Sequence, residues 1–147
     1  MKVKELMTKN VLTVSPNDNV DRVFFLINFE NIRHVPVVEK GKLVGIVSDR
    51  DLKKVLGPPK KFLEKPDGGG VTISSRKVRT LLRRAPITIE PQQRAADAAA
   101  IMAKKKIGAL PVFHKDKLVG IITATDILKA FVKLSNILEP YSSSKKD

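Results

Sequence analysis

Cysteine is absent from the 147-residue chain, which excludes disulfide bonds and thiolate metal sites and is compatible with a reducing compartment. Tryptophan is absent too, and aromatic residues make up only 5%, so any core must be largely aliphatic. No run of 18 apolar residues exists, and no apolar run follows the lysines of the N-terminal MKVKELMTKN. We therefore expect neither a membrane-spanning helix nor a signal peptide, and we expect a cytoplasmic protein with no membrane partner.

Negative charge is scarce as well, because 15 Asp and Glu stand against 28 Lys and Arg and give a net charge of +13. The excess is uneven, and residues 76–134 alone carry +9. A field of that size favours anionic ligands, nucleotides and nucleic acids alike. Solvated surface lysines are the simpler explanation of the same charge.

The chain contains an internal repeat of more than a third of its length. Residues 2–56 align with residues 77–131 without a gap, and 16 of the 55 pairs are identical. The identities include prolines, a Lys-Leu-Val-Gly-Ile run at 42–46 and again at 117–121, and an aspartate at 51 and 126. This repeat predicts two like domains, residues 1–56 and 76–134, joined by a Pro- and Gly-rich linker at 57–75 and followed by a tail at 135–147.

Each copy shows the same succession of apolar patterns. A short strand (11–14 or 87–89) precedes a helix with apolar residues on one face, then a hairpin (35–38 with 43–47, or 110–113 with 118–122), then a second helix. We expect the first of these second helices to bury Leu52, Val55 and Leu56, and the other to bury Ile127, Ala130, Phe131 and Leu134. The predicted fold class is α/β (α+β), with two β-α-β-β-α domains packed as a pseudo-twofold pair, because one copy alone buries little surface.

Catalytic and metal-binding patterns are missing from the sequence. His34 and His114 do not occupy equivalent repeat positions, so they do not form a repeated ligand pair, and no metal site is expected. The Gly68–Gly70 run is not followed by the Lys-Ser/Thr of a phosphate loop, and no nucleophile or paired-acid motif occurs. We expect no enzyme activity and no tightly bound cofactor.

One polar motif does repeat: a strand containing Gly, then Ser/Thr-x-x-Asp, then a helix. It comprises Ser48 to Asp51 in the first copy and Thr123 to Asp126 in the second. A capping box at a helix start explains the motif structurally. The same atoms could bind a ligand, because a helix N-terminus offers N–H groups to a phosphate and an aspartate accepts bonds from a ribose diol.

The succession of elements with this motif, present twice, resembles the CBS (cystathionine-β-synthase) domain, and two in tandem resemble a Bateman module of the stand-alone, acetoin-utilisation type. The resemblance covers roughly residues 1–134. It implies two pseudo-symmetric clefts between the domains that bind AMP, ADP, ATP or sometimes S-adenosylmethionine. It also implies that the motif aspartate holds the ribose and that the adenine packs against the other domain.

Carried over residue by residue, the resemblance implies two unequal clefts. The first would use these side chains and walls: Arg33, His34, Ser48, Arg50, Asp51, Pro86, Ile87, Gly108 and Ala109. The second would use Val11, Leu12, Thr123, Thr125 and Asp126. Because Gly108 and Ala109 stand where the first copy has Arg33 and His34, the first cleft has more charge to offer phosphates.

The leading functional hypothesis is therefore a regulatory module that senses adenine nucleotides and acts on an unidentified protein partner. A nucleic-acid-binding protein is the alternative, favoured by the charge of residues 76–134 but not by any aromatic stacking platform. A structural dimerisation domain with empty clefts is a third. We expect a homodimer or larger assembly, because Phe25, Phe29, Ile101 and Leu134 are surplus to the predicted core.

Overall fold

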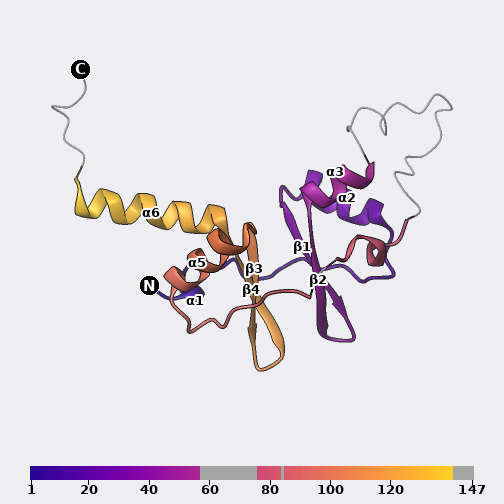
Figure 1. The fold of residues 1–147 in the computed structure, drawn as a ribbon, viewed down its shortest axis with the longest axis horizontal. Coiled ribbons are helices and arrows are strands. Elements are labelled where there is room, and N and C mark those ends of the chain that lie inside the picture. Colours follow the sequence, from indigo (N-terminus) through magenta and orange to yellow (C-terminus); the bar gives the residue numbers. More distant parts are fainter. Residues whose placement is uncertain (57–75, 84, 141–147) are drawn as a thin grey trace, which may run out of the picture. The chain divides into compact units, whose positions relative to one another are not determined.

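A computed structural model describes residues 1–56, 76–83 and 85–140 (Figure 1). The predicted linker, residues 57–75, lies outside the described residues, as does most of the predicted tail. In space the chain forms two units whose sequences interleave. Unit 1 consists of Met1–Asn10 and Thr88–Asp147, and unit 2 consists of Val11–Ile87. The unit boundaries therefore differ from those of the sequence repeat.

Unit 2 contains most of the elements of the first repeat, together with one short helix of the second. Helix α2 (Val20–Phe29) is followed by strands β1 (His34–Glu39) and β2 (Lys42–Ser48), then by helix α3 (Asp49–Leu56) and the 3-10 helix η1 (Val78–Leu81). In unit 1, helix α1 (Val3–Leu6) joins helix α5 (Ala95–Lys105), strands β3 (Ala109–His114) and β4 (Lys117–Thr123), and helix α6 (Ala124–Leu138). The predicted mixed helix-and-strand fold is confirmed, with one small antiparallel sheet in each unit.

The two hairpins match in register and in their irregularity. Each has a register shift at the same place, between Val37 and Val38 in unit 2 and between Val112 and Phe113 in unit 1. The connecting turns place two residues in the left-handed region: Lys40 and Gly41, or Lys115 and Asp116. Two positive φ angles in a two-residue loop are what the twist of a hairpin requires.

The predicted first strands are wrong in extent. Within 11–14 and 87–89 only Val14 and Ile89 pair, each through an isolated parallel bridge to the neighbouring hairpin. Val14 donates to the carbonyl of Pro36 (3.1 Å) and accepts from Val38 (2.8 Å), and Ile89 makes the corresponding bonds. Pro16 and Pro91 follow two residues later and remove the donor that a longer parallel pairing would need.

An exchange of short N-terminal segments completes each unit. Val3, from the first repeat, is fully buried in the core of unit 1, and Val78, its repeat equivalent, is fully buried in the core of unit 2. The backbone bonds correspond one to one, since Val3 donates to the carbonyl of Gln93 (2.9 Å) and Val78 donates to that of Asp18 (2.9 Å). Each repeat therefore supplies the short helix that closes the unit built on the other.

Close backbone approach explains the repeated glycine. A Cβ on Gly120 would lie 2.8 Å from the carbonyl oxygen of Thr8 and 2.7 Å from Sδ of Met7. Both residues belong to the inserted N-terminal segment, Met1–Asn10, which the first repeat contributes to unit 1. A Cβ on Gly45 would meet only the side chain of Leu82, at 2.5 Å. The glycines thus make room on each hairpin for the segment that comes from the other repeat.

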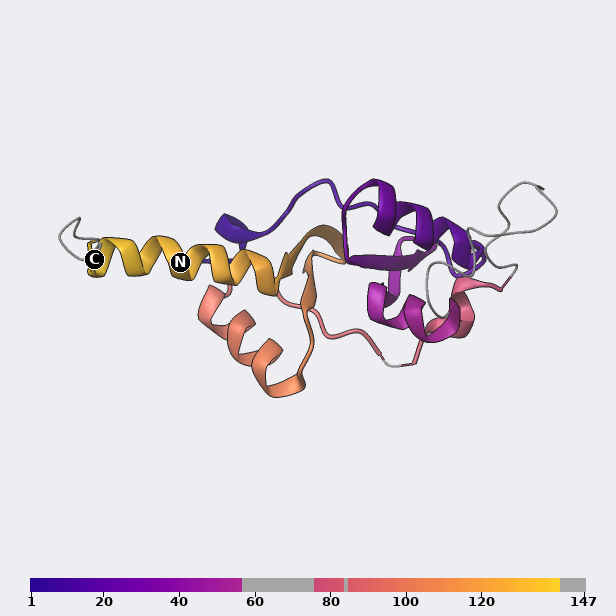
Figure 2. The ribbon, with the colours of Figure 1, turned by 90° about the horizontal axis from the view of Figure 1, so that it is seen from above.

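Helix α6 is less buried than its pattern predicts. Ala130 is buried, but Phe131 and Leu134 are 64% and 43% exposed, so the expectation that both are buried is wrong. The helix packs on α1 and α5 over its first turns, and both views show it continuing beyond α5 (Figures 1 and 2). Its last turns have no neighbouring element among the described residues of unit 1 to cover them.

Candidate functional site

The Ser48-x-x-Asp51 motif of unit 2 joins the end of β2 to the start of α3. Oδ2 of Asp51 accepts from the backbone N–H of Ser48 (2.9 Å) and from its hydroxyl (2.9 Å). The Ser48 Oγ accepts from the backbone N–H of Asp51 (3.2 Å). This reciprocal pair is a capping box, which fixes the aspartate rotamer. Within the described part of the chain, the bonds to this carboxylate all go to Oδ2, so Oδ1 remains as an acceptor.

The motif of unit 1 has the same geometry. Oδ2 of Asp126 accepts from the N–H (2.9 Å) and hydroxyl (3.0 Å) of Thr123, and Thr123 Oγ1 accepts from the N–H of Asp126 (3.2 Å). Two of the three distances are the same in both units, and the hydroxyl bond measures 2.9 Å in unit 2 and 3.0 Å in unit 1. The structural interpretation of the motif as a capping box is therefore correct in both units, and it leaves one carboxylate oxygen available in each.

The N-termini of α3 and α6 leave fewer backbone N–H groups free for a ligand than the sequence suggests. In unit 2 the N–H of Asp49 donates to the carbonyl of Arg33 (2.9 Å), and in unit 1 the N–H of Ala124 donates to that of Gly108 (2.9 Å). With the Asp51 amide bonded to Ser48, the amide of Arg50 is the remaining donor of the first three in α3. A phosphate at this place would therefore depend mainly on side chains.

His34 lies at the start of β1, directly across the hairpin from Ser48. Burial lowers the pKa of His34 below its ordinary value of 6.5, and Arg33 adds to this, although the carboxylates of Asp49 and Asp51 oppose it. His34 is therefore mainly neutral at pH 7 and can donate or accept a hydrogen bond. Sequence reasoning missed Asp49 as a member of this cluster.

Charge distinguishes the two motif regions. In unit 2, the exposed Arg50 lies within the motif and the exposed Arg33 directly precedes β1. In unit 1, the equivalent positions are Gly108 and Thr125, which carry no charge. Since the capping boxes are alike, the two motif regions differ in these neighbouring residues and in His34 and Asp49, whose equivalents are Ala109 and Ala124.

The remaining predicted site residues divide between the units. Unit 2 contains these members of the two predicted clefts: Val11, Leu12, Arg33, His34, Ser48, Arg50, Asp51, Pro86 and Ile87. Unit 1 contains Gly108, Ala109, Thr123, Thr125 and Asp126. Among the described residues, no group of three His, Asp or Glu side chains could hold a metal ion, and no helix there is long and apolar enough to cross a membrane.

Comparison with known proteins identifies the repeat. The family model for the CBS domain matches residues 3–58 and again residues 78–133. This chain belongs to the CBS domain family. Because the two matches coincide with the two copies of the repeat, the chain is a tandem CBS pair.

The CBS pair is similar to stand-alone proteins of about its own length. It is 32% identical over 143 residues to a CBS domain-containing protein of Dictyostelium discoideum, covering 95% of this chain and 97% of that protein. It also matches a crystal structure of a protein described as an acetoin utilization protein (AcuB) from Vibrio cholerae. That match has a TM-score of 0.74 and 30% identity, and covers 97% of this chain and 98% of the other.

Two further matched structures contain ligands. The CBS domain pair of the protein MJ0100 was crystallised with 5-methylthioadenosine and S-adenosyl-L-methionine, and has a TM-score of 0.75 at 26% identity, covering 91% of this chain and 98% of that one. CBSX2 was crystallised with AMP, and has a TM-score of 0.72 at 27% identity with the same coverage. These two matched structures thus hold ligands that share an adenosine group.

Proposed function

We propose that this CBS pair is a regulatory, non-catalytic module that binds an adenine nucleotide (AMP, ADP or ATP) and passes its state of occupancy to a partner protein. One observation carries the proposal: in each unit a capping box holds the motif aspartate rigidly, while Oδ1 receives no bond from the described residues. A fixed carboxylate oxygen is suited to accept from a ribose hydroxyl, and such charge-assisted bonds are the stronger kind. The adenosine ligands of MJ0100 and CBSX2 support the same assignment.

The phosphates would be bound at the motif of unit 2. Arg33 and Arg50 supply positive charge there, and the neutral His34 supplies a hydrogen-bonding ring. The adenine would lie against Pro86 and Ile87 of the same unit. At the Thr123–Asp126 motif, Thr125 brings no charge, so this motif would accept the adenosine group and would hold phosphates weakly.

Calorimetric titration of the full chain tests this function. The ligands are adenosine, AMP, ADP, ATP, S-adenosylmethionine and a single-stranded oligonucleotide, and the variants are Arg33→Gln and the control Lys53→Gln. Lys53 is an exposed cation of α3 outside the motif, so its loss changes net charge equally. Arg33→Gln should weaken ATP binding by about tenfold, the loss of one charged hydrogen bond, and leave adenosine binding within about twofold.

Absence of heat and of any shift in melting temperature with every adenine ligand would refute the nucleotide function and favour a structural dimerisation domain. If both variants weakened ATP binding equally, this would show a general charge effect and would refute the assignment of Arg33 to the phosphates. Binding of the oligonucleotide alone would favour the nucleic-acid alternative.

The structure does not favour that alternative, because the cations of residues 76–79 hold their segment to unit 2. Lys77 Nζ donates to Oδ1 of Asn19 (2.9 Å), and Arg79 Nη2 donates to Oδ1 of Asn17 (2.8 Å). Arg76 Nε donates to the hydroxyl of Thr80 (2.6 Å). Three of the cations behind the nucleic-acid alternative thus make hydrogen bonds within unit 2.

We also propose that the CBS pair forms a homodimer through α2. Phe25 and Phe29 stack with ring centroids 5.7 Å apart on the outer face of this helix, and Phe29 is 75% exposed. They line a hollow of about 460 Å³ whose rim carries Arg22 near one end of the helix and Glu30 just past the other. An antiparallel pairing of two copies of α2 would bury the phenylalanines and bring Arg22 of each copy near Glu30 of the other.

A further inference from the structure

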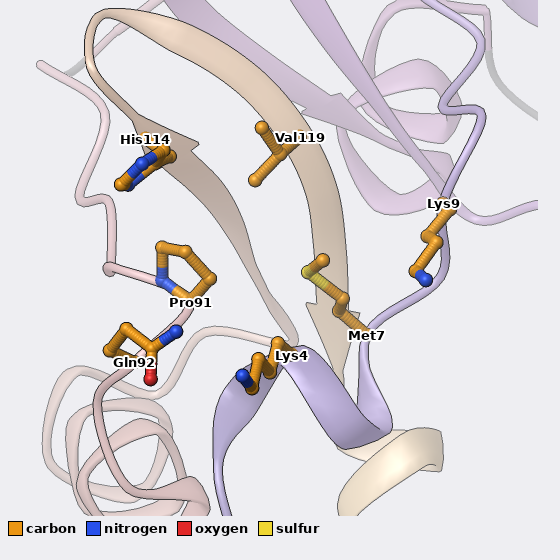
Figure 3. A pocket seen from close by; sticks show the side chains of 7 residues that line it. All are labelled: Lys4, Met7, Lys9, Pro91, Gln92, His114 and Val119. Atoms are coloured by element: carbon orange, nitrogen blue, oxygen red, sulfur yellow. The ribbon is translucent and has the colours of Figure 1, made fainter.

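Unit 1 contains a hollow of about 300 Å³ between the β3–β4 hairpin and the inserted N-terminal segment (Figure 3). Its floor is apolar, whereas its rim carries two lysines, an amide and an imidazole. The lining residues are Met7, Pro91 and Val119, with Lys4, Lys9, Gln92 and His114. The hollow contains none of the residues of the Ser/Thr-x-x-Asp motifs, so it is a separate place on the molecule.

The repeat provides an internal reference for this hollow. Lys4, Gln92 and His114 of unit 1 occupy the same repeat positions as Arg79, Asn17 and Glu39 of unit 2. In unit 2 these three side chains bind one another. Arg79 Nη2 donates to Oδ1 of Asn17 (2.8 Å) and contacts Oε2 of Glu39 (3.4 Å). The carboxylate of Glu39 thus completes a small network there.

In unit 1 the corresponding network is broken, because His114 replaces the carboxylate. His114 instead faces Glu90, with Nδ1 3.8 Å from Oε2, and Gln92 accepts from Nζ of Lys2 (2.9 Å). The side chain of Lys4 has no hydrogen-bond or ion-pair partner among the described residues, and neither has that of Lys9. Unit 1 therefore keeps the cation of the network in Lys4 but has no carboxylate at the position of Glu39.

We propose that this hollow binds a small organic carboxylate, whose carboxylate group pairs with Lys4 as Glu39 pairs with Arg79 in unit 2. Lys4 and Lys9 would hold the carboxylate by charge-assisted hydrogen bonds. The apolar end of the ligand would lie on Met7 and Val119, where a free phosphate or chloride would gain nothing. A volume near the lower limit for ligand pockets fits a short acid rather than a nucleotide.

Binding in this hollow would act on the inserted segment. The N–H of Thr8 donates to the carbonyl of Ile121 (2.8 Å), and the N–H of Ile121 donates back to Thr8 (3.0 Å), so one bridge joins the segment to β4. A ligand held by lysines of the segment and by the apolar side chain of Val119 would add a second connection across the same junction. The ligand should therefore stabilise unit 1 increasingly as its concentration rises above its dissociation constant.

Amide NMR spectra of the full-length ¹⁵N-labelled protein at pH 7.5 test the proposal. Sodium butyrate is the probe, with sodium chloride and sodium phosphate at equal ionic strength as references. Butyrate should give saturable shifts of the Lys9 and Val119 amides that neither reference reproduces. Lys4→Gln should weaken the fitted affinity about tenfold, the scale of a lost charged bond, whereas Lys53→Gln, an equal charge change in unit 2, should leave it unaltered.

One double variant makes use of the difference between the two repeats. The double variant Glu90→Gln, His114→Glu supplies Lys4 with the missing carboxylate and removes the residue that would repel it, so it should abolish butyrate binding. Its melting temperature, equal to or above that of the unaltered protein, would show that the fold is kept. Shifts no larger than those with chloride, shifts with phosphate alone, or full butyrate affinity in either Lys4→Gln or the double variant would overturn the proposal.

Discussion

Replacing each motif aspartate by alanine separates the structural role of the motif from its proposed role in binding. Asp51 and Asp126 make the same three capping bonds at matching distances, 2.9, 2.9 and 3.2 Å against 2.9, 3.0 and 3.2 Å. Both are partly buried and both stand in the first turn of a helix. Asp51→Ala and Asp126→Ala should therefore cost similar stability, whatever either residue binds.

The size of each effect follows from the bonds. Losing a capping box lowers the free energy of unfolding by about 0.5–2 kcal/mol. In a chain of this size, each kcal/mol lost lowers the melting temperature by roughly 2–4 °C. Losing a carboxylate that accepts from a ribose hydroxyl costs about 1.5–3 kcal/mol of binding, a factor of ten or more in affinity. The stability effect should be equal in the two variants, but the effect on AMP affinity should be larger for Asp51→Ala.

Differential scanning fluorimetry and calorimetry with AMP measure the two quantities on the same samples. Measurements of affinity should be made well below both melting temperatures, so that unfolding does not reduce the fraction of binding-competent protein. If both variants lose stability and neither loses affinity for AMP, the aspartates only cap their helices and the ribose assignment is wrong.

Three further predictions concern the fold and its assembly. Because burial lowers the pKa of His34 below 6.5, the unfolded chain binds this proton more tightly than the folded protein does. The free energy of unfolding should therefore fall as the pH drops from above 6.5 through the lower folded-state pKa, and His34→Gln should make the melting temperature less dependent on pH between 7.5 and 5.5. Gly120→Ala should lower the free energy of unfolding in urea by about 1–3 kcal/mol, since its Cβ meets the backbone of Thr8. Gly45→Ala should lower it less, because only a leucine side chain must move, and equal losses in the two variants would contradict this. Phe29→Glu should convert a dimer into a monomer in sedimentation velocity, and an unaltered protein that is monomeric at tens of micromolar would disprove the α2 interface.

Most of the secondary structure could be predicted because the same local pattern occurs twice. The hairpins consist of short continuous apolar runs joined by two-residue turns, and both helices that follow them begin at a Ser or Thr cap, so local chemistry determines them. The short helices α1 and η1 were missed because they have four residues each and their packing partners are distant in sequence. In the sequence, these two segments share three identities, Lys2, Val3 and Leu6 with Lys77, Val78 and Leu81.

The sequence predicted the capping boxes of the two Ser/Thr-x-x-Asp motifs, but not all of the bonds around them. The motif spacing identified Ser48 and Asp51, yet the capping box and the bond from Asp49 to the Arg33 carbonyl use up donors that the sequence suggested were free. Such competition depends on how the preceding strand approaches the helix, which periodicity does not describe. The hollow beside His114 had a signal in the sequence, namely the change from Glu39 to His114 between the copies.

The reciprocal insertion of α1 and η1 means that neither repeat is an autonomous folding unit. A fragment ending after α3 would leave its own core open where Val78 should enter, and would expose Val3 with nowhere to bury it. A truncation of the first ten residues would therefore damage the unit built on the second repeat, at the other end of the sequence, rather than the first. A gene encoding a single copy could yield a closed fold only if two molecules traded these segments, so joining two copies in one chain turns a concentration-dependent assembly into an intramolecular one.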